Sequence, residues 1–386
     1  MGTVTVWDEL IGQHKAVEVL QRATSGGRHA MTHAWLFVGP PGSGRSNAAK
    51  AFAAALQCER GGCGECNDCR TSLSGAHPDV TLLRTEQLSI GVEEVRQLVG
   101  RANVSPVNRR WQVVIVEDAD RVTERGADAL LKAIEEPAPR TVWLLCAPSA
   151  DDVIVTIRSR CRKLQLVTPG IDAVADLLVT RDGISPALAA HCARAAQGHV
   201  GRARMLARSD SARIRRNEIL TLPGRLRCLT DCLTAAENLV AASADEAAQA
   251  TADVDAKELA ELQAAMGMGG RGAKPRSAQA AVRELEDQQK MRAKRMQRDA
   301  LDNVLTELTG FYRDVLALQT APGVELINAD LTDQISPIAR RSTGEQTIHA
   351  LDAILEARTA LETNVAPQLA MEALMVSLAE AGRTTV

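Results

Sequence analysis

The glycine-rich stretch at residues 39–46, GPPGSGRS, is the first candidate for chemistry in this chain. It follows an apolar run and opens into an alanine-rich segment, the order of strand, loop and helix that a phosphate-binding site needs. Small residues let backbone N–H groups surround phosphate oxygens, and the helix N-terminus adds partial positive charge. The template G-x-x-x-x-G-K-[ST] is met except that Arg45 replaces the lysine. The loop predicts a nucleotide site formed by Gly39, Pro40, Gly42, Gly44, Arg45 and Ser46.

Two carboxylates, Glu117 and Asp118, directly follow the apolar run at 111–116. A strand that delivers acids at its C-terminal end is how a Mg²⁺ ion is held opposite a phosphate loop. Acids that are merely exposed at a strand end explain the same pattern in isolation, but the glycine-rich loop upstream favours a magnesium site. We therefore expect Glu117 and Asp118 to complete a site for ATP or ADP with Mg²⁺.

Four cysteines within twelve residues form a second candidate site. Four thiolates at this spacing can close a tetrahedral Zn²⁺ site, and the glycines between them allow the tight turns that it requires. Four unrelated surface cysteines are the alternative, which a reducing compartment disfavours. Because four thiolates leave no coordination position open for water, the zinc is expected to be structural. Its ligands would be Cys58, Cys63, Cys66 and Cys69.

The composition describes an ordinary globular protein: 386 residues, 45% hydrophobic and 24% charged. A net charge of −3 provides no general attraction to nucleic acid, so any such contact must be local. No apolar run approaches the roughly 20 residues of a membrane-spanning helix. The first ten residues lack the basic and apolar regions of a secretory signal. We therefore expect a cytoplasmic protein without membrane contact.

Alternating apolar runs and helical patterns predict a parallel α/β sheet with helices on both faces. The expected strands are 35–38, 80–83, 111–116, 141–147 and 164–167. The predicted organisation is an α/β domain at 1–167 that carries the zinc module at 58–69, a small helical domain at 168–210, and a helical domain at 211–386. Within the last, an exposed insertion is expected around 246–298, because 266–278 is rich in glycine and basic residues without apolar periodicity. A contact for another protein is the alternative reading of 266–298.

Taken together, these motifs resemble those of bacterial clamp-loader subunits of the AAA+ class, the gamma/tau and delta-prime subunits of DNA polymerase III. The resemblance covers nearly the whole chain. Its most specific features are the zinc module, which comes after the helix that follows the glycine-rich loop, and the tripeptide Ser159-Arg160-Cys161. The matching segments are WDELIGQ at 7–13, HAWLFVGPPGSGRS at 33–46, IGVEEVRQL at 90–98, ALLKAIEEP at 129–137, TIRSRC at 156–161 and NVAPQLAMEALM at 364–375.

The resemblance implies an AAA+ nucleotide-binding domain, a three-helix lid at 168–210 and a helical collar at 211–386. In this family the collar joins gamma/tau and delta subunits in a five-membered ring, which loads the sliding beta clamp onto primed DNA at the replisome on the nucleoid. The resemblance also implies that Arg160 acts in trans as an arginine finger on a neighbour's ATP, a role that suits the planar, permanently charged guanidinium. An internal ion pair of Arg160 is the alternative.

The departures from the family pattern bear on catalysis. A hydrolysing gamma-type subunit would carry lysine at 45, Asp-Glu at 117–118, Thr or Ser after the strand at 141–147, and a lid arginine near 198–204. Instead, this chain has Arg45, Glu117-Asp118 in reversed order, Ala147-Pro148, and Gly201 with Arg202 one place later. These changes favour a delta-prime-type subunit that supplies a finger and hydrolyses little ATP, and they leave nucleotide binding open. The alternatives are an active gamma/tau-type ATPase and a zinc-bearing nucleic-acid-binding module.

Overall fold

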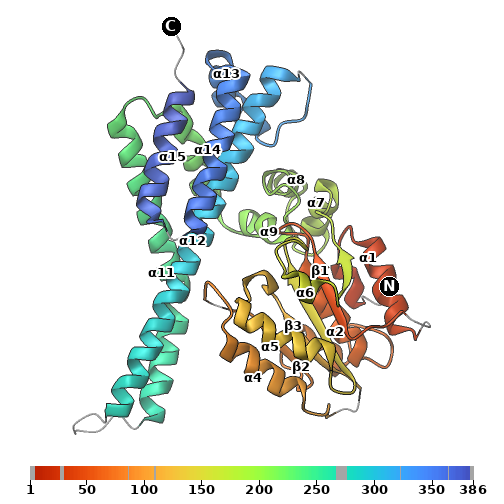
Figure 1. The fold of residues 1–386 in the computed structure, drawn as a ribbon. Coiled ribbons are helices and arrows are strands. Elements are labelled where there is room, and N and C mark those ends of the chain that lie inside the picture. Colours follow the sequence, from red (N-terminus) through yellow and green to blue (C-terminus); the bar gives the residue numbers. More distant parts are fainter. Residues whose placement is uncertain are drawn as a thin grey trace. The chain divides into compact units, whose positions relative to one another are not determined.

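The computed structural model describes residues 5–26, 30–85, 87–107, 110–266, 276–321, 323–363 and 365–382. The chain divides into two compact units, Met1–Arg208 and Ser209–Val386, which Figure 1 colours from red to green and from green to blue. Within the described ranges, no helix is both long enough and apolar enough to cross a membrane.

A five-stranded parallel sheet organises the first unit, with strand order β2-β3-β4-β1-β5. The central strands are continuous apolar runs because helices cover both faces, so every side chain of these strands is buried. The predicted parallel α/β sheet is confirmed. The strands are β1 (Ala34–Val38), β2 (Val80–Leu83), β3 (Gln112–Val116), β4 (Thr141–Ala147) and β5 (Arg162–Gln165).

Strand β5 begins two residues before the segment predicted for it. It lies at the edge of the sheet, where only Leu164 of its four residues is buried. An edge strand tolerates exposed polar side chains such as those of Arg162 and Lys163, so the apolar run at 164–167 marks its position imperfectly. Leu166 still continues the pairing, since its N–H donates to the Val38 carbonyl at 2.7 Å.

Alternate side chains of the strands form two apolar cores, one on each face of the sheet. Trp35 and Phe37 pack with α1 and α2, whereas Leu36 and Val38 pack with α4 and α5. Figure 1 shows these two helix pairs on the two sides of the sheet. Three short helices, α7 to α9, end the unit, in agreement with the helical pattern predicted there. The helices are η1 (Val6–Glu9), α1 (His14–Thr24), α2 (Arg45–Gln57), α3 (Asn67–Ser74), α4 (Val92–Ala102), η2 (Ala119–Arg121), α5 (Glu124–Glu135), α6 (Val155–Arg158), α7 (Ile171–Thr180), α8 (Pro186–Ala195) and α9 (Val200–Arg208).

The second unit is entirely helical where it is described, as predicted, and packs around its own apolar core. A buried ion pair joins its first helix to its longest one, with Arg216 Nε 3.0 Å from Glu307 Oε2. The elements are α10 (Asp210–Thr221), η3 (Leu222–Gly224), α11 (Leu229–Ala265), α12 (Arg276–Thr320), η4 (Ala329–Leu331), α13 (Thr332–Arg341), α14 (Gly344–Glu362) and α15 (Pro367–Ala381).

Helices α11 and α12 run side by side as a long hairpin and take up most of the segment expected to be an exposed insertion (Figure 1). Small buried residues, Ser243, Ala247 and Thr251, let the two helices approach closely. Arg292 of α12 pairs with Asp255 at 2.6 Å and with Glu258 of α11 at 2.8 Å. The insertion is therefore largely helical. The centre of the predicted loop, 267–275, lies outside the described residues.

Candidate nucleotide pocket and metal site

The glycine-rich loop joins β1 to α2, as its sequence predicted. Gly42 and Gly44 both have a φ of 84°, a left-handed conformation that favours glycine. A Cβ at Gly42 would lie only 2.4 Å from Cγ of His199, whereas one at Gly44 would meet nothing within 4 Å. Glycine at position 42 is thus needed both for the turn and for the close approach of the α9 segment to the loop.

A pocket of about 290 Å³ opens between this loop, the segment before α1 and the helices α7 and α9. Of the residues predicted for a nucleotide site, Gly42, Gly44, Arg45 and Ser46 line it, but Gly39, Pro40, Glu117 and Asp118 do not. The other residues of the lining are Glu9, Leu10, Ile11, Gln13, Ser43, Asn47, Pro169, Leu177, Arg181, His199, Val200, Gly201 and Arg204.

The pocket is lined by three arginines and one acid, a balance that suits an anionic ligand. Arg45 turns back toward its own loop and donates to the Gly39 carbonyl. Arg181 lies 3.4 Å from Glu9, and Arg204 donates to Asp182 at 2.8 Å. Sequence reasoning missed both of these arginines. The available signal was helical spacing. Arg181 comes one turn after Leu177, and Arg204 comes one turn after Gly201, and both of these earlier residues also line the pocket.

His199 covers the loop from the side of α9. Its Nδ1 accepts a hydrogen bond from the Arg202 backbone N–H at 3.2 Å, which assigns the proton of a neutral ring to Nε2. Burial lowers the pKa of the imidazole, and the positive charge of Arg202 lowers it further. His199 is therefore neutral at pH 7 and presents an N–H donor rather than a charge.

Glu117 is engaged by two cations. Lys50 Nζ of α2 lies 3.0 Å from one carboxylate oxygen, and Arg84 Nε lies 3.7 Å from the other. The Glu117 side chain is only about 10% exposed, so this pairing holds it in place. Lys50 is thus the close partner of this carboxylate, whereas the exposed Arg84 approaches its second oxygen only loosely. Asp118 is the N-cap residue of η2, and its carbonyl accepts from the Arg121 N–H at 3.0 Å.

Gln13 links the segment before α1 to the loop. Its amide nitrogen donates to the Ser43 carbonyl at 3.0 Å and to the Val167 carbonyl at 2.6 Å, and its oxygen accepts from the Val167 N–H at 3.2 Å. The side chain is 3% exposed, so these backbone groups have little access to water in its place. Gln13 therefore fixes one wall of the pocket to its floor.

Replacing Gln13 with leucine should lower the free energy of unfolding by about 1–3 kcal/mol, because it leaves buried backbone groups without partners. Chemical denaturation of the purified chain measures the change. Gln165→Leu is the matched control, since Gln165 is exposed and bonds only to the neighbouring Leu166 carbonyl. Equal effects of the two substitutions would show that the Gln13 contacts contribute nothing specific.

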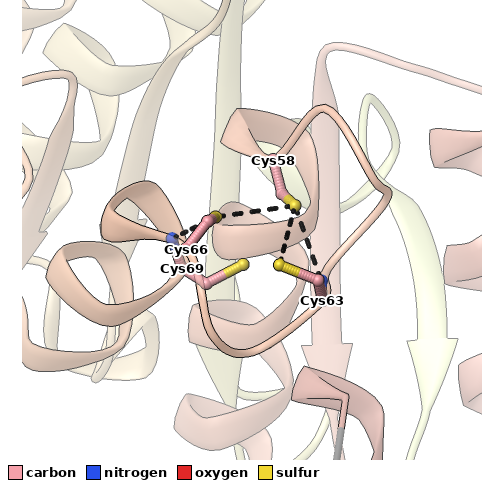
Figure 2. Close-up of side chains that lie close together, drawn as sticks. All are labelled: Cys58, Cys63, Cys66 and Cys69. Atoms are coloured by element: carbon pink, nitrogen blue, oxygen red, sulfur yellow. Dashed lines mark hydrogen bonds between the residues drawn. The ribbon is translucent and has the colours of Figure 1, made fainter. Parts of the chain in front are cut away.

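The four cysteines gather at the end of α2, as Figure 2 shows. All four Sγ atoms lie within 4.8 Å of one another, and Cys58 Sγ is 3.7 Å from both Cys63 Sγ and Cys66 Sγ. With Zn–S bonds of about 2.3 Å, the edge of a tetrahedral site is about 3.8 Å. The spacing of the sulfurs therefore fits a bound zinc ion.

Backbone geometry supports this cluster. Gly61, Gly62 and Gly64 have φ values of 67°, 104° and 77°, which the turns between the cysteines require. Cys58 Sγ accepts from the Arg60 N–H at 3.3 Å. Backbone N–H groups of Cys66 and Glu65 lower the pKa of the Cys63 thiol to about 6. Such hydrogen bonds stabilise the thiolate, the form that binds metal.

Arg160 lies in the turn after α6 and forms an ion pair with α5. Its Nη2 is 2.5 Å from Glu135 Oε1, and its Nη1 donates to the Thr156 carbonyl at 2.8 Å. Both side chains of the pair are about 40% exposed. An exposed pair contributes only about 0–1 kcal/mol. The internal ion pair considered as an alternative thus exists in the single chain, but it is weak enough for a partner to displace.

Comparison with known proteins places this geometry in context. The family described as "DNA polymerase III, delta subunit" matches residues 12–169, which hold the loop, the cysteines and Arg160. DNA polymerase III subunit delta' of Pseudomonas aeruginosa is 38% identical over 154 residues, covering 38% of this chain and 47% of that protein. The Bacillus subtilis subunit delta' is 28% identical over 355 residues, covering 91% and 92%. Subunit gamma/tau of Mycobacterium tuberculosis is 35% identical over 157 residues, covering 39% and 27%.

The matched segment thus spans about half the length of the Pseudomonas relative and about a quarter of the mycobacterial one, whereas the Bacillus relative aligns over nearly its whole length. The family resemblance predicted from the motifs is confirmed: this chain is a relative of the delta' and gamma/tau subunits of DNA polymerase III.

Proposed function

We propose that this chain is a delta-prime-type AAA+ subunit of a clamp loader, which supports loading of the sliding beta clamp onto primed DNA while hydrolysing little ATP itself. The alignment over nearly the full length of a subunit delta' supports this assignment. Its partners would be gamma/tau and delta subunits in a five-membered ring, with the beta clamp and DNA reached through the complex. Residues 168–210 would form the lid, and 211–386 the collar.

The engagement of Glu117 carries the non-hydrolytic part of the proposal. In a hydrolysing site the carboxylate at this strand end orients water or holds the metal. Here Lys50 lies 3.0 Å from one oxygen of Glu117, and Arg45, which lines the pocket, donates to the Gly39 carbonyl of its own loop. The pocket retains the loop glycines and its arginines, which supports binding of ATP or ADP. The cysteine cluster supports a structural Zn²⁺ ion.

Steady-state phosphate release by the purified chain tests this function. We expect turnover at least about a hundredfold below that of the hydrolysing subunit of the same loader, because positioning and one charge stabiliser are both lost. Arg45→Lys alone should not restore turnover, since Glu117 stays paired with Lys50. Turnover equal to that of the hydrolysing subunit, and abolished by Glu117→Gln, would instead establish a gamma/tau-type ATPase.

A further inference from the structure

The segment at residues 5–13 joins the cysteine module to the nucleotide pocket. At its first end, the Val6 N–H donates to the Gly62 carbonyl at 3.0 Å, and Trp7 Nε1 donates to the Gly61 carbonyl at 3.2 Å. Both acceptors lie in the turn between Cys58 and Cys63. Val6 and Trp7 are buried in the same apolar core that contains Cys58 and Cys69. This end of the segment is therefore held to the cysteine module by hydrogen bonds and apolar packing.

The opposite end of the segment forms a wall of the pocket. Glu9, Leu10 and Ile11 line the pocket, and Gln13 bonds to the loop at Ser43. The wall has no regular helix of its own beyond the short η1. Between its two anchored ends, Leu10 is buried in the apolar core and Glu9 pairs with Arg181 at 3.4 Å. Gln13 secures one end, and the turn at Gly61 and Gly62 secures the other.

We propose that the cysteine module positions the pocket wall through Val6 and Trp7, so that metal binding at the module and nucleotide binding in the pocket favour each other. This inference rests on the proposed zinc and nucleotide sites. Without metal the turn between Cys58 and Cys63 loses its constraint, because few apolar groups hold it. Val6 and Trp7 then lose fixed partners, and the wall gains freedom that a ligand must remove.

Gly62 is the tightest point of this connection. Its φ is 104°, and a Cβ there would lie 2.6 Å from Cγ2 of Val6 and 3.2 Å from Cβ of Ala55. Gly61 also has a positive φ, 67°, but a Cβ there would meet nothing within 4 Å. Alanine at position 62 would therefore strain the turn and push on Val6, whereas alanine at position 61 would strain the turn without touching the wall.

The experiment uses the full chain with Gly62→Ala, and Gly61→Ala as its matched control. Amide hydrogen exchange of residues 5–13 reports the wall, metal analysis reports zinc, and a fluorescent ADP analogue reports the pocket. Gly62→Ala should keep its zinc, speed exchange at Val6 about tenfold and weaken ADP binding about fivefold, the lower end of typical couplings between sites. Gly61→Ala should change the exchange and the ADP affinity far less.

Trp7→Phe provides a second test that keeps an aromatic side chain but removes the indole N–H that donates to Gly61, together with the pyrrole part of the ring. It should also speed exchange in the wall while zinc remains bound. Removal of zinc from the wild-type chain by a chelator should reproduce the effect of Gly62→Ala on both exchange and ADP affinity. By reciprocity, ADP should raise the affinity for zinc by the same factor.

The outcomes separate this inference from the proposed function. If Gly62→Ala, Trp7→Phe and chelation all leave exchange at 5–13 unchanged, the positioning role is overturned even where zinc and ADP bind normally. If wild-type chain binds no ADP, the proposed nucleotide site fails, and the exchange measurements still decide whether the module positions the wall. If it holds no zinc, coupling to metal is overturned.

Discussion

Cys63→Ser should lower the zinc content from one ion per chain to less than about a tenth, and it should loosen residues 58–77. Structural zinc contributes about 10–16 kcal/mol of apparent binding free energy in small metal-dependent domains. Here the turns between the cysteines are built from glycines with positive φ, so the metal is the main constraint on the turn from Cys58 to Cys66. Loss of one ligand should therefore release the metal and the turn together.

Metal analysis and limited proteolysis measure this result. Cys228→Ser is the control, since Cys228 is exposed and lies in the second unit at the start of α11. That variant should keep its zinc and resist protease like the wild type. Wild-type protein with clearly less than one zinc per chain, or a Cys63→Ser variant that retains the metal, would rule out the four-cysteine site.

Arg160→Ala should lower the ATPase of a reconstituted clamp loader by about a thousandfold or more at the neighbouring site, if Arg160 supplies the arginine finger there. Folding should be unaffected, because the exposed pair with Glu135 contributes only about 0–1 kcal/mol. Ring assembly should also be intact. The measurement is phosphate release by the assembled loader, with size-exclusion chromatography as the test of assembly.

Glu135→Ala distinguishes the two roles of Arg160. It removes the same ion pair but leaves the guanidinium free for a neighbour, so the ATPase of the loader should be retained. A purely structural ion pair would make the two substitutions equivalent. Equal losses in Arg160→Ala and Glu135→Ala, or no loss in Arg160→Ala, would therefore remove the arginine-finger assignment.

The central part of the fold was predictable from local sequence. Strands β3 and β4 are buried on both faces, so they appear as unbroken apolar runs between turn residues. Edge strand β5 is less distinct, because only Leu164 must be apolar. The α11–α12 hairpin was missed for a different reason. Its buried outer residues are small, and its larger apolar residues such as Leu259 and Leu285 are only half-buried among many charged ones, so the apolar pattern there is weak.

The two candidate sites also differ in how well local sequence predicts them. The cysteine cluster is local in sequence, so spacing alone brought its four residues together. The pocket combines the loop with Arg181, His199 and Arg204, which lie more than a hundred residues later. The pairing of Glu117 with Lys50 depends on how α2 packs against β3, and no spacing rule predicts it. The lining of the pocket and the partner of Glu117 therefore depend on long-range packing, which local sequence patterns do not predict.

The construction of the α11–α12 hairpin has a consequence for how the second unit unfolds. Large apolar residues join the two helices to the core at Cys232–Val240 and from Leu301 onward. Farther out, the fully buried residues are small, and larger apolar side chains such as Leu259 and Leu285 are only half-buried, so less apolar surface is removed from water there. The outer part should therefore open at free energies well below that of the core, so one melting temperature does not describe this unit.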